Sequence, residues 1–81
     1  MQLTFGQALD HLKEGDRVSR AGWNGKDMWL KLVEGYQVGP DKHVLGRRLL
    51  PWIGMKTADG SFVPWLASQT DLLAEDWVLW E

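Results

Sequence analysis

The 81-residue sequence contains no cysteine, one tyrosine, two histidines and three prolines. The lack of cysteine excludes disulfide bonds, thiolate nucleophiles and cysteine-ligated zinc. Two histidines provide little for a metal site or a proton shuttle, so we expect no cofactor and no metal. The formal net charge of −2 argues against a globally basic nucleic-acid-binding protein, and we expect no DNA or RNA partner.

Long hydrophobic runs are also missing. No run approaches the roughly 20 apolar residues of a membrane span. Met1-Gln2-Leu3 does not open a signal peptide, so we expect a soluble, cytosolic-type domain with no membrane partner. The chain is short enough that residues 1–81 are expected to form a single domain.

Tryptophan is the residue in excess, with six in the chain. A domain of this size hides only about 60% of the surface that its unfolded chain exposes, so its core needs reinforcement. Tryptophans are enriched at interfaces because each one buries a large area and has a single donor to satisfy. Trp52, Trp77 and Trp80 lie on strand-like segments and are expected in the core or at an interface. We therefore expect the chain to self-associate.

Charge is unevenly distributed along the chain. Residues 17–56 carry eight lysines and arginines against three acidic residues, whereas residues 57–81 carry five acidic residues and no lysine or arginine. A local positive field can attract an anion despite a negative total charge. The alternative is that these charges simply solvate loops and strands.

The first expected element is an amphipathic helix. Thr4 and Gln7 have the spacing of a capping box, and Gly15 supplies a left-handed stop. The apolar stripe between them has helical periodicity and consists of Phe5, Ala8, Leu9 and Leu12. His11 falls on or near the polar face, where a solvated histidine is expected.

Alternating apolar and polar residues predict antiparallel strands over residues 16–20, 28–33, 49–57, 62–63 and 76–80. In the second strand, Leu30 and Leu32 share one face and Trp29 lies on the other. Pro51 predicts that the third strand starts at an edge. Asp59-Gly60 predicts a tight hairpin turn after it. The stretch between residues 34 and 48 is longer than an ordinary hairpin loop and indicates either a function or disorder.

A short helix is expected before the last strand, with Ser68 and Thr70 as rival N-caps. The predicted fold is therefore α+β, with an amino-terminal helix packed on an antiparallel sheet of about five strands and a short helix before the last strand.

Catalysis is difficult to assemble from these residues. A nucleophile needs an activating base, and neither histidine falls in a recognisable motif. Asp71, Glu75 and Asp76 could act as an acid–base pair, but Asp71 beside Ser68 also fits the first turn of a helix. We expect no catalytic residue and no enzyme activity.

Binding is easier to support. Trp23 lies in the Gly22–Gly25 turn, where its ring could stack on a purine, and Arg20 and Lys26 flank it and could meet phosphates. The alternative is that Trp23 staples the turn onto its own sheet.

A second cluster follows Pro64. Ser68, Gln69 and Thr70 add side-chain donors at the start of the short helix, and Asp71 suits ribose hydroxyls or an adenine amino group. The alternative here is simple helix capping.

Two motifs resemble the phage Thoeris anti-defence proteins of the second type. They are Gly22-Trp23-Asn24-Gly25-Lys26 followed by Met28-Trp29-Leu30, and Met55-Lys56-Thr57-Ala58-Asp59-Gly60 running into Val63-Pro64-Trp65-Leu66-Ala67-Ser68-Gln69-Thr70-Asp71-Leu72-Leu73-Ala74-Glu75-Asp76-Trp77. The resemblance extends over essentially the whole chain, from the Phe5-Ala8-Leu9 helix onward.

The resemblance implies a sponge that binds cyclic ADP-ribose isomers made by bacterial TIR-domain sensors, the 1''–2' and 1''–3' glycocyclic forms, and holds them intact. It also implies a homotetramer with pockets between protomers, acting in the cytoplasm of the infected host, and in some members separate sites for CBASS cyclic dinucleotides. Carried over, Trp23 and Asn24 would stack and orient an adenine, and the segment with Trp65 and Ser68–Asp71 would complete the pocket from a neighbouring protomer.

Two other functions stay open at this point. One is an enzyme that degrades the same nucleotide, with Asp71 or Glu75 as base. The other is a protein–protein inhibitor that blocks a host effector with its tryptophan surface.

Overall fold

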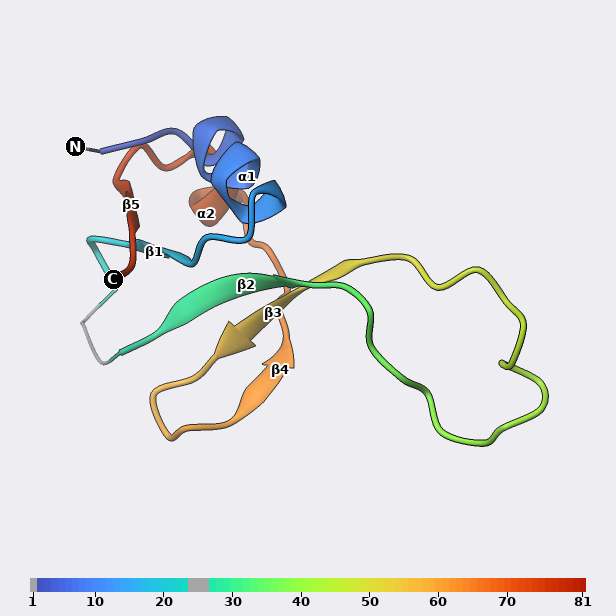
Figure 1. Cartoon of the computed structure of the whole chain (residues 1–81). Coiled ribbons are helices and arrows are strands. Elements are labelled where there is room, and N and C mark those ends of the chain that lie inside the picture. The colour runs from blue at the N-terminus through green and yellow to red at the C-terminus, as the bar shows by residue number, and fades with distance from the viewer. Residues whose placement is uncertain (1, 24–26) are drawn as a thin grey trace.

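The computed structural model describes residues 2–23 and 27–81 and confirms the α+β fold predicted from the sequence (Figure 1). Within these residues the chain forms, in order, α1 (Phe5–Lys13), β1 (Val18–Arg20), β2 (Trp29–Val33), β3 (Trp52–Lys56), β4 (Phe62–Pro64), α2 (Gln69–Leu73) and β5 (Trp77–Leu79). The five described strands form one antiparallel sheet in the order β4-β3-β2-β1-β5.

Helix α1 begins at the predicted capping box. The Thr4 hydroxyl accepts a hydrogen bond from the Gln7 amide at 3.2 Å, and the Gln7 side chain accepts one from the Thr4 amide at 2.9 Å. Gly15 follows the helix with a φ of 94°, the left-handed conformation predicted for the stop. Ala8 and Leu12 of the apolar stripe are fully buried, so α1 covers one face of the sheet.

Trp77 is the centre of the core. It is fully buried at the start of β5, together with Leu12, Val18 and Leu30. The Trp77 indole N–H donates a hydrogen bond to the main-chain carbonyl of Asp71 at 3.0 Å, which satisfies its one polar atom. The expectation that Trp77 is a core residue is confirmed.

The β3–β4 hairpin contains the predicted Asp-Gly turn. The Thr57 amide donates to the Ser61 carbonyl at 2.8 Å, and the Asp59 carboxylate accepts from the Ser61 amide at 3.0 Å. Gly60 has a φ of 92°, which only glycine adopts without strain. Pro64 is the last residue of β4, one residue beyond the predicted end of this strand.

The third strand differs from its prediction in length and in position. Its first paired residue is Trp52, opposite Val33, rather than residue 49. Because Pro51 has no N–H to donate to a ladder, the chain before Trp52 leaves the sheet. β3 is also an interior strand between β2 and β4, so the edge position predicted from Pro51 is wrong.

Residues 34–51 connect β2 to β3 and project beyond the sheet as a long loop, which we call the arm (Figure 1). The arm makes the molecule elongated, with extents of 44 × 26 × 24 Å. It points away from the end of the sheet that carries α2.

The sheet face opposite α1 carries a row of aromatic side chains. The ring centroids of Trp52 and Phe62 lie 6.0 Å apart, those of Phe62 and Trp29 6.2 Å, and those of Trp29 and Trp80 5.7 Å. The Arg17 guanidinium lies 4.8 Å from the Trp80 ring centroid and 5.3 Å from that of Trp29. These are cation–π distances, and the row covers the face of the sheet that no helix covers.

Neither α1 nor α2, the helices of the described residues, is long and apolar enough to cross a membrane.

Replacement of Gly54 is expected to destabilise the sheet. A Cβ at Gly54 would clash with the Phe62 ring and lie 3.0 Å from the Trp52 ring. Gly54→Ala should therefore lower the free energy of unfolding by about 1–3 kcal/mol, measured by urea denaturation.

Gly6→Ala is the matched control, because its Cβ would meet only the Thr4 hydroxyl oxygen at 3.8 Å. This change should be neutral or stabilising by up to about 1 kcal/mol, since alanine favours a helix. Equal stability of the two variants would contradict the close packing of Phe62 on Gly54.

Candidate functional site

The two clusters predicted from the sequence meet at one end of the sheet. Arg20 ends β1 and contacts Asp71 of α2, although 51 positions separate them in the sequence. Trp23 and Trp65 both pack edge-on against Trp77, with centroid distances of 5.4 and 5.9 Å. The chain alone therefore joins groups that the resemblance placed on neighbouring protomers.

An ion-pair network holds this end of the sheet. Arg20 Nη1 donates to Asp71 Oδ1 at 2.8 Å, and Arg20 Nε donates to Asp76 Oδ1 at 2.8 Å. The three side chains are 16–25% exposed, so the network is half-buried. We call Arg20, Asp71 and Asp76 the arginine–carboxylate network.

Strand register explains why these side chains meet. Arg20 pairs with Trp77 across β1 and β5, which places Asp76 beside the end of β1. The Gly22 amide donates to Asp76 Oδ2 at 2.9 Å, and a Cβ on Gly22 would lie 2.8 Å from the same oxygen. Glycine therefore lets the turn after β1 approach the carboxylate closely.

The contacts within the network shift the pKa values of all three side chains. The hydrogen bonds that Arg20 donates to Asp76 and then to Asp71 raise its pKa above the ordinary value, so it stays charged. Partial burial disfavours the charged form of Asp71, yet hydrogen bonds from Arg20 and Ser68 lower the pKa of its carboxyl. The pKa of Asp76 is also lowered, chiefly by its hydrogen bond from Arg20. One positive and two negative charges leave the network with a net charge of −1.

Ser68 is the N-cap of α2, so of the two predicted N-caps, Ser68 and Thr70, the structure has Ser68. The Asp71 amide donates to the Ser68 hydroxyl at 3.0 Å. Gln69 and Thr70 are exposed on the first turn. Ser68 therefore caps the helix, which was the alternative to ligand binding for this cluster. The Asp71 carboxylate accepts a hydrogen bond from Arg20.

The predicted stacking residues are half-buried. Trp23 contacts the core through the edge-to-face arrangement with Trp77, which realises the alternative that it staples the turn onto its sheet. Trp65 packs on Phe5 with a centroid distance of 5.6 Å. Asn24 and Lys26, also predicted to bind ligand, lie outside the described residues.

Asp76 is the member of the network that sequence reasoning missed as a partner of Arg20. The two residues are 56 positions apart, and their contact depends on the pairing of β1 with β5. The sequence has an acidic residue before the last predicted strand and a basic residue in the first predicted strand. These charges are compatible with the observed pairing, but they are compatible with many other registers too.

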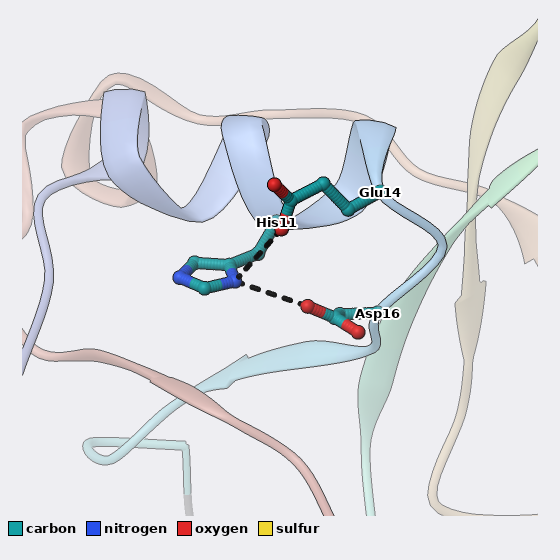
Figure 2. Close-up of side chains that lie close together, drawn as sticks. All are labelled: His11, Glu14 and Asp16. Atoms are coloured by element: carbon teal, nitrogen blue, oxygen red, sulfur yellow. Dashed lines mark hydrogen bonds and ion pairs between the residues drawn. The ribbon is translucent and has the colours of Figure 1, made fainter.

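A second polar cluster lies where α1 ends (Figure 2). His11 Nδ1 lies 3.0 Å from an Asp16 carboxylate oxygen and 3.7 Å from a Glu14 carboxylate oxygen. Their ligand atoms lie within 4.8 Å of one another, a spacing that a divalent cation could use. The Asp16 amide also donates to the His11 carbonyl at 3.0 Å, so the cluster closes the end of the helix.

The candidate site brings aromatic rings and carboxylates together at one end of the sheet. The chain belongs to the family of Thoeris anti-defense 2-like domains, whose family model matches residues 3–80. It is similar to the protein named Thoeris anti-defense 2 of Bacillus phage SP01, with 40% identity over 82 aligned residues. The match covers 94% of this chain and 92% of the relative, which confirms the resemblance found in the sequence.

Acidification is expected to destabilise the fold through the network. Asp71 and Asp76 have a lowered pKa in the folded chain, so the unfolded chain binds more protons in acid. Their contribution is complete above the unfolded pKa of about 4 and is lost as the pH falls through the lowered folded values. Thermal unfolding between pH 7 and pH 2 should show Tm falling below about pH 4.

The Asp76→Asn variant should start with a lower Tm at pH 7, by the equivalent of about 1–3 kcal/mol, because Arg20 loses a charged partner. It should then lose less Tm on acidification than the wild type. Asp10→Asn, on the exposed side of α1, is the control. A parallel loss in wild type and Asp76→Asn would show that the network does not couple stability to pH.

Proposed function

We propose that this chain is a phage anti-defence protein that captures the cyclic ADP-ribose signals of TIR-domain sensors and holds them without cleavage. The observation that carries the proposal is family membership over residues 3–80, together with the 40% identity to a Thoeris anti-defense 2 protein. The proposed place of action is the cytoplasm of the infected bacterium. The ligands are the 1''–2' and 1''–3' glycocyclic forms.

The end of the sheet with Trp23 and Trp65 has groups suited to such a ligand. Indole rings stack on adenine, at roughly 1–3 kcal/mol per base. Carboxylates accept hydrogen bonds from ribose hydroxyls, and Asp71 and Asp76 are ionised at neutral pH, as aspartates with an ordinary or a lowered pKa are. In this proposal the rings bind the base and the carboxylates bind the sugar.

The diphosphate of the ligand needs positively charged partners. The arginine–carboxylate network cannot provide one, because Arg20 is already paired with Asp71 and Asp76. Both carboxylates bond the Arg20 guanidinium, and the network has a net charge of −1. Lys26 follows the Trp23 turn in the sequence and is one proposed source of positive charge. A second protomer is the other source.

In this proposal the chain forms a homotetramer whose ligand pockets lie between protomers, because a chain this small has little room for a deep pocket of its own. Burying 70–90% of a ligand of this size takes a deep pocket, and a small monomer has little interior to spare. A sponge for a dilute signal needs about nanomolar affinity, roughly −12 kcal/mol, which such burial helps to supply. Separate sites for cyclic dinucleotides of the CBASS system are a further part of the proposal.

Capture without cleavage separates this proposal from a degrading enzyme. The protein should be incubated with 1''–3' glycocyclic ADP-ribose, denatured by heat, and the released nucleotide identified by mass spectrometry. Unchanged ligand is expected in stoichiometric amount. Release of an opened or hydrolysed product would instead support the enzyme, with Asp71 or Glu75 as base.

Trp23→Ala is expected to weaken ligand binding about 5- to 150-fold in calorimetry, the equivalent of the lost stacking. It should also lower Tm, because Trp23 packs on Trp77. Trp29→Ala is the matched control, since it removes an indole from the opposite face of the sheet. The control should lose stability and keep the wild-type affinity.

Ligand binding should raise the wild-type Tm, because only the folded chain binds. If a panel of cyclic ADP-ribose isomers and cyclic dinucleotides leaves Tm unchanged, the protein–protein inhibitor becomes the better account. Equal loss of affinity in Trp23→Ala and Trp29→Ala would remove Trp23 from the site.

A further inference from the structure

The arm exposes apolar side chains that nothing in its own chain covers in the described structure. Four of them, far from the core, are exposed by 38–58%: Val38, Leu45, Leu49 and Leu50. Exposed apolar side chains that gather in one segment of a folded chain are typical of an interaction site.

Local hydrogen bonds give the arm a defined shape. The Tyr36 hydroxyl donates to the Leu50 carbonyl at 2.6 Å, which ties the two sides of the arm together near its base. Asp41 accepts a hydrogen bond from the His43 amide at 2.8 Å at the tip. Between base and tip lies a hollow of ≈ 440 Å³ lined mostly by apolar side chains, among them Tyr36, Val38, Leu45 and Leu49.

A second group of exposed leucines lies on segment 66–73, between β4 and β5. Leu66 is 91% exposed and Leu73 is 78% exposed, far more than the leucines of the core. Leu72, on the same short segment, is 43% exposed. Leucine side chains that are exposed on a folded segment have the apolar chemistry that an apolar hollow accepts.

The charges around the two surfaces are of opposite sign. The outer part of the arm, residues 37–50, carries Lys42, Arg47 and Arg48 against Asp41. Residues 66–76 carry three acidic residues and no lysine or arginine, and Glu75 is the exposed one. Contact between two arms, or between two 66–73 segments, would bring like charges together, whereas arm against segment brings opposite charges together.

The two surfaces cannot meet within the chain as it is folded. The arm extends from the β2–β3 end of the sheet, away from α2 (Figure 1). A second copy of this chain offers both the exposed leucines and the acidic charge that would match the arm.

We propose that the arm of one copy docks on segment 66–73 of another copy, with Leu66 and Leu73 in the hollow and Arg47 or Arg48 beside Glu75. This inference rests on the self-association in the proposed function. An exchange of arms in both directions closes a dimer with two-fold symmetry, because each copy offers both surfaces. Such a dimer is one of the contacts from which a tetramer is built.

The exchange would also bring charge to the candidate site. Segment 66–73 contains Ser68 and Asp71, so the partner's arm would place arginine side chains next to the arginine–carboxylate network. These arginines would supply the positive charge for a diphosphate that Arg20 does not spare. The site would then be completed by the second copy.

Cysteine cross-linking tests the contact directly, because the chain has no cysteine of its own. Leu49→Cys and Leu73→Cys should be prepared as separate full-length chains with different tags, mixed and oxidised. A mixed disulfide dimer is expected, since a disulfide needs Cα atoms within about 7 Å. Leu45→Cys with Leu66→Cys is the second pair, in case the register differs.

Ala58→Cys, in the exposed β3–β4 turn, is the matched control partner. The contact is overturned if both pairs cross-link no better than Leu49→Cys with Ala58→Cys. It is equally overturned if Leu49→Cys alone cross-links as well as the mixture, since that outcome indicates arm against arm.

Charge reversal tests the same contact without cross-linking. The double variant Arg47→Glu, Arg48→Glu and the single variant Glu75→Arg should each weaken assembly at least about tenfold, measured by sedimentation velocity over a range of concentrations. The combination of all three changes should restore assembly. Restoration is a readout that simple misfolding would not give.

The outcomes separate this inference from the proposed function. If the wild type sediments as a monomer at every concentration, the proposed self-association fails and the arm exchange fails with it. If the wild type assembles and all charge variants assemble equally well, the arm exchange fails alone. Calorimetry with 1''–3' glycocyclic ADP-ribose then reports independently on nucleotide capture.

Discussion

The burial of Trp77 is the interaction on which the rest of the structure depends. Its indole fills the space between α1 and the sheet, and its N–H ties the turn of α2 to the core. The rings of Phe5, Trp23 and Trp65 pack around it at centroid distances of 5.3–5.9 Å. In a domain this small, one fully buried indole organises the helices, the last strand and the candidate site together.

The candidate site combines aromatic surface with a deficit of positive charge. Two carboxylates hold one guanidinium, so the network fixes the geometry of β1, α2 and β5 but leaves no cation to spare. The arm, which points away from α2, carries Lys42, Arg47 and Arg48. This separation is the physical reason why we propose that a second copy adds positive charge to the site.

Local patterns in the sequence predicted most of the fold. The capping box of Thr4, the Asp59-Gly60 turn and the alternation around Leu30 depend on residues within a few positions, and the structure confirms each of them. The pairing of Arg20 with Asp76 depends on strand register across 56 positions, which no local pattern specifies. The predicted edge position of the third strand failed for the same reason, because neighbours in a sheet are chosen by tertiary packing.

The order of the strands has a consequence for synthesis of the protein. β5 is the last strand along the chain, yet it lies between β1 and the amino-terminal residue Leu3, which forms a bridge with Trp77. The hydrophobic core therefore cannot close while β5 is still inside the ribosome. Until β5 has left the ribosome, α1 and β1 lack their main packing partner. The nascent chain therefore exposes apolar surface that favours aggregation until folding is complete.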